Sequence, residues 1–328
     1  MQNTSSMPRI AAIGEVMIEL SPASHNQDPL GQGKNLAFAG DSYNTAITLA
    51  RLGIPTSYCT RLGDDAYSEQ ILQQLICEGI ATDSVVKSDG DVPGLYMINN
   101  TSNGEREFLY WRSNAPARQL FSIYDEREKL VEHLSASEWL YFSGISLAIL
   151  SAPGREFLFQ FLTEYRAKGG KVAFDSNYRP RLWASVELAQ TAMMAAMAQT
   201  DLALLTLDDE ALLWEDGNLE ASLERYKDLD IPELVFKRGA EDVIVFQGTK
   251  KICVPVKPVH NIIDTTAAGD TFNAGYIAAR LNQLTPELAA QQASRCAGII
   301  IQHRGGVIDK NSFLTQLALA QQDTQNPG

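Results

Sequence analysis

The segment Asp264–Asp270 (DTTAAGD) combines polar side chains with small residues and runs directly into a helical pattern that begins at Thr271. Its small residues at 267–269 would let a ligand approach the backbone, and the first turn of a helix offers N–H groups without intrahelical partners. Such a helix start can bind a phosphoryl group, while Asp270 accepts a proton from the alcohol that attacks it. The alternative is that Thr266 or Asp270 simply caps the helix.

A second polar segment, Gly40–Asn44 (GDSYN), precedes an apolar helical pattern that ends at Gly53. Asp41 and Asn44 would lie at the start of that helix, where their side chains could bind the hydroxyl groups of a sugar. Taken alone, this segment is also explained as a helix cap. A second segment of this kind, near the other end of the chain, nevertheless strengthens the functional interpretation of the first.

The common nucleotide-binding loops and metal motifs are absent from the sequence. Asn35 and Val172 follow the two Gly–Lys pairs, where a P-loop requires Ser or Thr. Leu36 stands where a dinucleotide-binding GxGxxG motif would need its third glycine. The four cysteines lie far apart without a CxxC pair, and the four histidines show no ligand spacing, so we expect buried thiols rather than disulfides or structural zinc.

The elements around these segments alternate between apolar runs and stretches of helical period, as in βαβ units. Helices are expected over 42–52, 66–78 and 153–168, and in two segments after residue 268. Continuous apolar strands indicate a sheet that is covered on both faces, and hence a mostly parallel doubly wound α/β architecture. The expected strands are Ile10–Val16, Thr56–Arg61, Trp139–Phe142, Val172–Phe174, Leu202–Leu205, Leu234–Phe236 and Val243–Phe246.

Two stretches, residues 17–38 and 93–113, do not fit this alternation because they are rich in Gly, Pro, Asn and aromatic residues. In the second, Leu95–Asn99 and Glu107–Trp111 flank a turn at Asn100–Gly104, as in a hairpin. We expect a small β appendage assembled from both stretches.

Composition and charge exclude several classes of function. The 328 residues are 45% hydrophobic, and 40 acidic against 27 basic residues give a net charge of −13, so neither nucleic acid nor an anionic membrane is expected as a partner. The most apolar stretch, Trp139–Leu150, is short of the ~20 residues of a membrane span. The N-terminal sequence lacks the layout of a secretory signal, so we expect a cytoplasmic protein.

Together, Gly40–Asn44 and Asp264–Asp270 resemble the two signatures of the PfkB (ribokinase-like) carbohydrate kinase family, and the resemblance covers residues 9–310. It implies a single domain over residues 1–328, a ribokinase-like αβα sandwich whose small β lid comes from segments 17–38 and 93–113. Further strings resemble the bacterial members that act on 2-keto-3-deoxygluconate: Gly94–Tyr96, Tyr110–Arg112, Ser143–Leu150, Asp175–Trp183 and Leu205–Glu210.

The resemblance implies transfer of the γ-phosphate of ATP, with Mg²⁺, to the 6-hydroxyl of this sugar acid to give 2-keto-3-deoxy-6-phosphogluconate. It also implies a homo-oligomer, since lids of this kind often pack against a second subunit. It assigns Asp270 as the general base and the amides of Ala267, Ala268, Gly269 and Asp270 as the anion hole. The residues that it assigns to the sugar are Gly40, Asp41, Asn44, Tyr96, Tyr110, Arg112 and Arg179. Those that it assigns to the nucleotide are Asn177, Arg179, Lys237, Gly239, Ala268 and Gly269.

Chemistry favours a sugar acid, because its carboxylate needs fixed cations and Arg112 and Arg179 supply two guanidinium groups in a sparsely basic region. Either arginine alone is explained as well by a surface ion pair. Tyr96 and Tyr110 could cover the sugar or only pack the hairpin, and Lys237 could be a solvated strand end. The rival functions are a neutral-sugar kinase, such as a ribokinase or fructokinase, and a catalytically silent sugar-binding regulator.

Three positions depart from the family pattern. Ala39 and Ala267 stand where glycine is frequent, and alanine at 267 is tolerable if its φ angle is negative. Leu207 replaces the Asn of the usual N-x-x-E ahead of Glu210, which puts the family's Mg²⁺ arrangement in doubt. Glu210 could still hold the metal through water, or it could be a solvated helical carboxylate.

Overall fold

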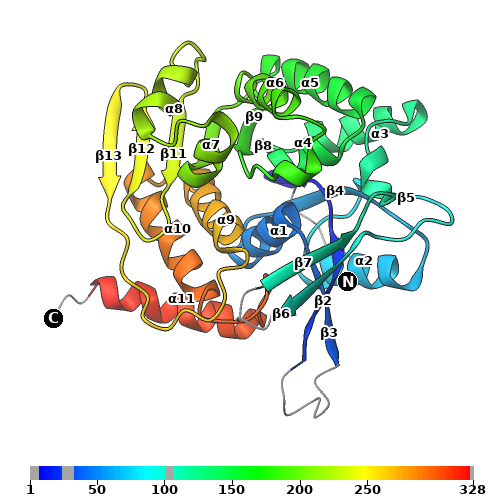
Figure 1. Cartoon of the computed structure of the whole chain (residues 1–328), viewed down its shortest axis with the longest axis horizontal. Coiled ribbons are helices and arrows are strands. Elements are labelled where there is room, and N and C mark those ends of the chain that lie inside the picture. Colours follow the sequence, from blue (N-terminus) through cyan, green and yellow to red (C-terminus); the bar gives the residue numbers. More distant parts are fainter. Residues whose placement is uncertain (1–6, 24–32, 101–105, 326–328) are drawn as a thin grey trace.

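The computed structural model describes residues 7–23, 33–100 and 106–325, and its centre is a nine-stranded sheet (Figure 1). The strands lie in the order β13-β12-β11-β10-β9-β8-β1-β4-β5. Those from β11 to β5 are parallel, while β12 and β13 are added antiparallel at one edge. The bounds are β1 Ile10–Ile13, β4 Thr56–Leu62, β5 Val85–Lys87, β8 Trp139–Ser143, β9 Lys171–Asp175, β10 Leu202–Thr206, β11 Glu233–Lys237, β12 Val243–Gln247 and β13 Lys250–Val254.

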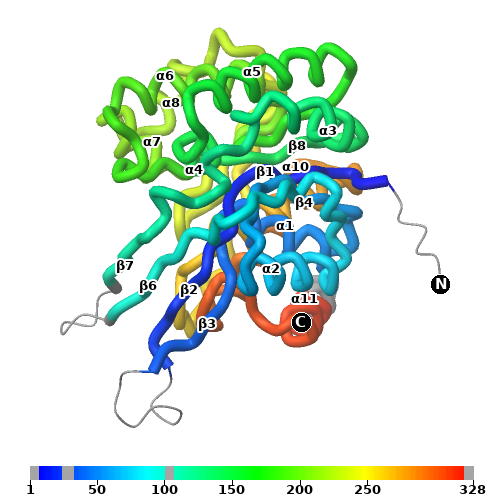
Figure 2. Tube along the Cα trace, turned by 90° about the vertical axis from the view of Figure 1, so that its right-hand side faces the viewer, coloured from blue at the N-terminus to red at the C-terminus, as the bar shows by residue number. Residues whose placement is uncertain are grey.

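Helices cover both faces of this sheet, which gives three layers (Figure 2). The helices expected over 42–52, 66–78 and 153–168 are confirmed as α1, α2 and α5, each to within one residue. On one face lie α1 Asp41–Arg51, α2 Ala66–Cys77, α9 Ala268–Leu281, α10 Pro286–Ile300 and α11 Lys310–Gln325. On the other lie α3 Tyr124–Ser135, α4 Gly144–Ile149, α5 Ala152–Ala167, α6 Val186–Met197, α7 Leu207–Trp214 and α8 Leu219–Tyr226, with the short turns η1 Pro116–Gln119 and η2 Pro180–Leu182.

The alternation of side chains along each strand divides the interior into two hydrophobic cores. On β8, Tyr141 joins the core beneath α1 and α9, while its neighbour Phe142 joins the core beneath α5 and α6. Because helices cover both faces of the sheet, the strand residues that point to either face can be apolar, which explains the continuous apolar runs. Each of the seven expected strands is confirmed, although β1 ends at Ile13, short of its expected end at Val16.

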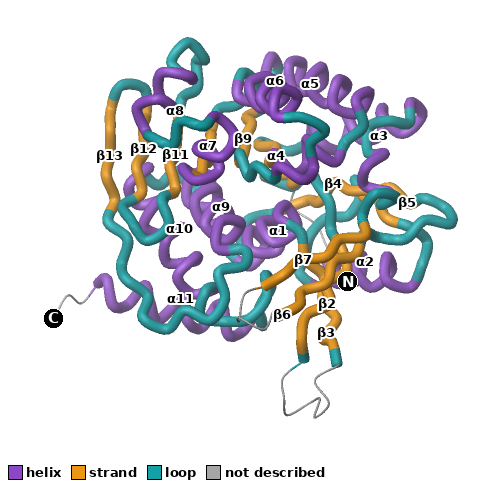
Figure 3. Tube along the Cα trace, in the orientation of Figure 1, coloured by secondary structure: helices purple, strands orange, loops and turns teal. Residues whose placement is uncertain are grey.

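A second, smaller sheet extends away from the three layers, and we call it the small sheet (Figures 1 and 3). It comes from the two stretches expected to form a β appendage, although their parts 24–32 and 101–105, including most of the expected turn, lie outside the described residues. Antiparallel pairs β2–β3 and β6–β7 meet through parallel pairing of β2 with β6. Its strands are β2 Met17–Pro22, β3 Lys34–Ala39, β6 Leu95–Asn100 and β7 Arg106–Trp111.

Two expectations, one about membrane-spanning segments and one about the thiols, can be compared with the structure. In the described ranges, no helix combines the length and apolar character needed to cross a membrane. The four cysteines are free; Cys59 and Cys296 are buried as expected, whereas Cys77 and Cys253 are exposed. The exposed pair differs from expectation because both lie at the margins of their elements, outside the two main cores.

Helices α9 and α10 approach each other at Gly275, and this contact should be essential for stability. A Cβ atom at Gly275 would lie 2.8 Å from the Ala293 Cα, so Gly275→Ala must push the helices apart. Overpacking of this kind costs roughly 1–3 kcal/mol, and the midpoint of urea unfolding, followed by circular dichroism, should fall.

Gly298→Ala, the same substitution within α10, is the matched control. There a new Cβ would approach only the end of a flexible side chain, Val259 Cγ2, at 3.3 Å. Alanine is the better helix former by about 1 kcal/mol, so this variant should unfold at the same or a higher urea concentration. Equal midpoints for the two variants would show that the α9–α10 contact is not tight.

Candidate active site

The candidate site lies at the carboxyl edge of the large sheet, where the strand order changes direction. The chain passes from β1 to β4 on one side and later returns to β8 on the other, so a crevice is expected between the loops that diverge at this edge. Helices α1 and α9 both begin at this edge and pack against each other. The two polar segments singled out in the sequence, more than 200 residues apart, therefore meet.

Asp270 stands in the first turn of α9 and is held by the helix that carries the other segment. The Asn44 side chain donates a hydrogen bond of 2.8 Å from Nδ2 to Asp270 Oδ2. Thr45 donates from Oγ1 to the backbone oxygen of Asp270 at 3.2 Å. These contacts fix the direction of the carboxyl group and leave its other oxygen, Oδ1, for a ligand hydroxyl.

Burial and the neighbouring Asp41 carboxylate raise the pKa of Asp270 to about 8, and the hydrogen bond from Asn44 opposes this shift. Asp175 raises the pKa of Asp270 further, whereas the Lys237 ammonium lowers it. A carboxyl group with a pKa near neutrality is suited to accept a proton from a substrate and to release it again.

Asp41, at the start of α1, has partners on the opposite side of the crevice. Ser143, at the end of β8, donates its hydroxyl to Asp41 Oδ2, and Asn177 Nδ2 donates to the same oxygen at 3.0 Å. Burial raises the pKa of Asp41 despite the Ser143 hydrogen bond. Asn177, which the resemblance assigned to the nucleotide, thus contacts a residue assigned to the sugar.

A buried polar network connects the two helices beneath the crevice. Lys237 Nζ, at the end of β11, donates to Asp175 Oδ1 at 2.9 Å and to Asn273 Oδ1 at 3.0 Å. Asn273 in turn donates to the hydroxyl of Tyr141 at 3.3 Å, and Thr45 Oγ1 lies 3.3 Å from the same hydroxyl. The alternative of a solvated strand end for Lys237 is wrong, because the side chain is buried in this network.

The loop ahead of α9, which was expected to form an anion cradle, differs from the expectation in two respects. Ala267 is left-handed, with φ of +59°, so the negative φ that would make alanine tolerable is not found, and the strain costs roughly 1–2 kcal/mol. The N–H of Ala268 already donates to the oxygen of Thr265 at 3.2 Å. Gly269 lies beside Lys237, since a Cβ there would be 3.8 Å from Nζ, so the ammonium adds positive charge to the helix start.

Arg112 follows β7 directly, and its guanidinium group pairs with Glu15, which follows β1. Arg112 Nη2 donates to Glu15 Oε2, and the two residues are 8% and 2% exposed. The guanidinium carbon also lies 6.0 Å from the centre of the Tyr110 ring. The explanation of Arg112 as a surface ion pair is therefore wrong, because the pair is buried.

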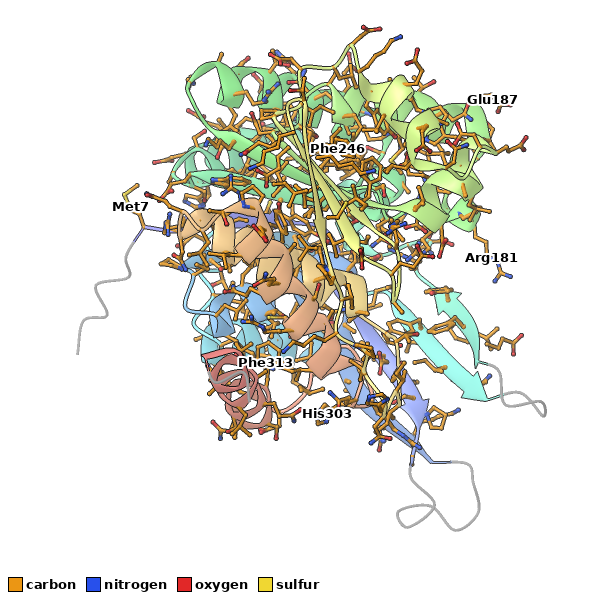
Figure 4. All side chains as sticks on the ribbon, turned by 90° about the vertical axis from the view of Figure 1, so that its left-hand side faces the viewer. Met7, Arg181, Glu187, Phe246, His303 and Phe313 are labelled. Atoms are coloured by element: carbon orange, nitrogen blue, oxygen red, sulfur yellow. The ribbon has the colours of Figure 1, made fainter. Side chains whose placement is uncertain are left out.

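Arg179 is more exposed than Arg112 and has a different acidic partner. Its Nη1 donates to Asp209 Oδ1 at 3.1 Å and to the Tyr178 oxygen at 2.7 Å. Arg181, two residues further on, projects away from the protein (Figure 4). The two arginines predicted to bind a carboxylate therefore both form ion pairs in the structure, Arg112 in a buried pair and Arg179 in a pair near the surface.

The two predicted tyrosines share one face of the small sheet. Tyr96 and Tyr110 are opposite each other in the β6–β7 register, with ring centres 5.8 Å apart. The Tyr96 hydroxyl donates to Glu19 on β2, and Phe108 packs against Tyr96 in a small core of its own. Tyr110 remains half exposed, which leaves one aromatic face available to a ligand.

Glu210 lies in surroundings that the sequence did not indicate. It is 1% exposed and accepts hydrogen bonds from Arg225 at 3.1 Å and from the Tyr226 hydroxyl at 2.8 Å. The alternative that Glu210 is a solvated helical carboxylate is therefore wrong. These bonds do not fit an anchor for metal-bound water. No cluster of three or more His, Cys, Asp or Glu suited to a metal ion occurs in the described part of the chain.

Both predicted glycines lie at turns or close contacts at this edge. A Cβ at Gly40 would be 2.2 Å from the Glu15 oxygen, so only glycine fits between β3 and α1. Gly239 follows β11 in a turn with φ of +62°. Sequence reasoning did not single out five residues at this edge, although each lies at or shortly after the end of a strand or in the first two turns of a helix: Glu15, Ser143, Asp175, Asn273 and Asp209.

Comparisons with known proteins agree with this geometry. The family model described as pfkB family carbohydrate kinase matches residues 7–312. The 2-dehydro-3-deoxygluconokinase of Escherichia coli K12 is 43% identical over 313 residues, covering 93% of this chain and 98% of that protein.

Solved structures share the fold at lower identity. The 2-dehydro-3-deoxygluconokinase of Thermotoga maritima superposes with a TM-score of 0.79 at 22% identity and covers 95% of this chain and 99% of its own. A fructokinase of Xylella fastidiosa with bound ATP gives a TM-score of 0.78 at 21% identity, covering 95% and 98%. From the match over residues 7–312 and the 43% identity to one member, the chain belongs to the pfkB family of carbohydrate kinases.

Proposed function

We propose that this protein is an ATP-dependent kinase that phosphorylates 2-keto-3-deoxygluconate at its 6-hydroxyl to give 2-keto-3-deoxy-6-phosphogluconate. The observation that carries the proposal is the position of Asp270, a carboxyl group in the first turn of a helix whose start can bind a phosphoryl group. Relatives at about 40% identity that are named 2-dehydro-3-deoxygluconokinase support the choice of substrate.

In this mechanism Asp270 removes the proton of the 6-hydroxyl as the oxygen attacks the γ-phosphorus of ATP. Asn44 keeps the Asp270 carboxyl group in place, and Asp41 binds neighbouring sugar hydroxyls. The amides of Ala267, Gly269 and Asp270 and the Lys237 ammonium stabilise the charge that develops on the transferred group. The deprotonated oxygen thereby forms the new P–O bond, and ADP leaves with the electron pair of the broken one.

The nucleotide enters as its Mg²⁺ complex, since this cation prefers phosphate oxygens and water to an all-protein site. Bound Mg²⁺ neutralises part of the charge of the β- and γ-phosphates. The buried bonds of Glu210 do not provide the metal-water anchor that the family pattern implied. Arg179, Asn177 and Gly239 stay assigned to the nucleotide side of the crevice as predictions.

Arg112 is proposed to bind the substrate carboxylate, with Tyr96 and Tyr110 covering the sugar chain and the small sheet acting as a lid that excludes water. Support comes from the burial of Arg112, because a buried guanidinium binds an anion more strongly than a solvated one. We further propose that residues 1–328 work as one kinase domain in the cytoplasm, where ATP is available. A neutral-sugar kinase would have no use for this cation.

Asp270→Asn should lower kcat about 10²–10⁴-fold, the usual contribution of a general base, while both ligands still bind. The amide has the size of the carboxyl group, keeps an acceptor for Asn44 and leaves the backbone amides in place. Coupled measurement of ADP release gives kcat, and calorimetric titration gives both affinities. Near-normal turnover would exclude Asp270 as the base, whereas a wild type without any ADP release would favour the silent regulator.

The pH profile of the wild type is the control for this assignment. Burial raises the pKa of Asp270 to about 8, so at neutral pH the carboxyl group of the free enzyme is mostly protonated and cannot act as a base. The value of kcat/KM should therefore rise with pH and level off above about pH 8. A profile that falls across this range would contradict a basic role for the group.

Arg112→Met should raise KM for 2-keto-3-deoxygluconate about ten- to a hundredfold and leave KM for ATP unchanged. A hydrogen bond to a charged group contributes roughly 1.5–3 kcal/mol, which corresponds to that range. Steady-state kinetics with each substrate varied in turn measure both constants. Arg181→Met, at the exposed arginine that projects away from the site, is the matched control and should behave as wild type. Equal activity of the wild type on fructose would favour the neutral-sugar kinase instead.

We also propose that the protein forms a homo-oligomer through the face of the small sheet opposite to Tyr96 and Tyr110. In register across the four strands, Leu36, Leu20, Met97 and Leu109 form an apolar row, and Leu36 and Leu109 are 43% and 36% exposed. A single sheet with apolar residues on both faces needs a cover on each, and a second copy offers a matching surface.

Light scattering coupled to gel filtration should therefore give a mass of at least two chains for the wild type. Leu109→Glu, which places a charge on this apolar row, should shift the mass towards a single chain of 36.0 kDa. A monomeric wild type, or an unchanged mass in the variant, would contradict the proposal.

A further inference from the structure

Four residues mark the places where the small sheet joins the three-layered body. Glu15 lies between β1 and β2, Gly40 between β3 and α1, Gly94 ahead of β6, and Arg112 directly after β7. Any motion of the small sheet relative to the body must therefore be accommodated around these four junctions.

The junctions are packed against one another, with Glu15 in the centre. A Cβ at Gly40 would lie 2.2 Å from the Glu15 backbone oxygen. A Cβ at Gly94 would lie 3.1 Å from both Glu15 Oε1 and Arg112 Cβ. The two glycines thus leave the space that the Glu15 and Arg112 side chains fill.

The Glu15–Arg112 ion pair is buried, yet each partner keeps an unused atom. Arg112 Nη2 donates to Glu15 Oε2, while Arg112 Nε and Glu15 Oε1 are buried without a hydrogen-bond partner. A buried polar atom without a hydrogen-bond partner is unfavourable, so each of these two atoms would gain from a ligand group that pairs with it. A ligand that brings an acceptor to Nε and a donor to Oε1 would satisfy both.

We propose that Glu15 is a positioning residue that holds the Arg112 guanidinium at the junction, with Nε–H directed to the substrate carboxylate. The inference rests on the function proposed above, because it assumes that Arg112 binds that carboxylate. Glu15 follows β1, a fully buried inner strand of the large sheet, whereas Arg112 follows a strand of the small sheet. The bond between them therefore sets the position of the cation relative to Asp41 and Asp270 on the body.

The alternative role of Glu15 is the opposite one, in which its carboxylate competes with the substrate for Arg112. The two roles predict opposite changes in the affinity for the sugar acid when the Glu15 carboxylate is removed. Without a positioning partner, the long Arg112 side chain recovers rotamer freedom that substrate binding must remove again, and sugar-acid affinity falls. Without a competitor, the pocket gains net positive charge and sugar-acid affinity rises.

Two variants at Glu15 distinguish these roles. Glu15→Gln keeps an oxygen that can accept from Arg112, whereas Glu15→Ala removes both charge and acceptor. We expect KM for 2-keto-3-deoxygluconate to rise about threefold to tenfold in Glu15→Gln and further in Glu15→Ala, with kcat at saturation and KM for ATP nearly unchanged. Should Glu15→Ala fail to fold, Glu15→Gln still decides the question. A KM that stays constant or falls in Glu15→Gln would overturn the proposal.

A double-mutant cycle shows whether Glu15 acts through Arg112. If it does, adding Glu15→Gln to Arg112→Met should change KM by less than about twofold beyond Arg112→Met alone. Full additivity of the two effects would overturn the proposal, because Glu15 would then bind the substrate independently or act on the fold as a whole.

The Arg51–Glu78 pair provides the matched control, since its side chains are 6% and 10% exposed and it joins α1 to the end of α2, away from the small sheet. Glu78→Gln should lower the melting temperature about as much as Glu15→Gln but leave KM unchanged. An equal rise of KM in both would overturn the proposal by showing a general effect of lost stability. Calorimetric titration of the wild type with the sugar acid is done first: no binding there refutes the proposed function, whereas binding that is equal in wild type and Glu15→Gln refutes only this inference.

Discussion

Three carboxyl groups converge at the carboxyl edge of the sheet, and their mutual repulsion is the constraint that the site is built around. Asp41, Asp175 and Asp270 come from a helix start, a strand end and another helix start. Asp41 and Asp175 raise the pKa of Asp270, and Asp175 raises that of Asp41. Each group is held by a donor from another element, and the positive ends of α1 and α9 favour acidic residues in their first turns. The buried network around Lys237 is therefore a requirement for bringing the carboxyl groups together.

The architecture could be predicted because its signals are local. A strand covered on both faces must be apolar throughout, so runs such as Leu202–Leu205 are visible without knowing what covers them. The segments Gly40–Asn44 and Asp264–Asp270 could be predicted in the same way, because Asp41 and Asp270 stand where apolar helical patterns begin. Parallel topology then requires such positions to lie at one edge, which is why Asn44 and Asp270 meet although 226 residues separate them.

The partners of the site residues could not be predicted, because they depend on packing between distant elements. Nothing near Arg112 in the sequence indicates that its carboxylate partner is Glu15, 97 residues earlier. Glu210 has the sequence context of an exposed helical residue, yet α8 buries it against Arg225 and Tyr226. Ala267 shows the same limit for the backbone: the need to turn the chain into α9 imposes a positive φ angle that alanine would not adopt by itself.

The division of residues between body and small sheet determines how a substrate can be recognised. Asp41, Asp270 and Lys237 lie on the body, whereas Tyr96, Tyr110 and Arg112 lie on or beside the small sheet. A six-carbon sugar acid carries its carboxylate at one end and its reacting hydroxyl at the other, so it can contact both parts at once. Binding energy from the charged end can then be used to close the small sheet over the reacting end, where it excludes water. A neutral sugar of the same length lacks that charged end and would leave the buried Arg112 Nε without an acceptor, so it would supply less binding energy for the same closure.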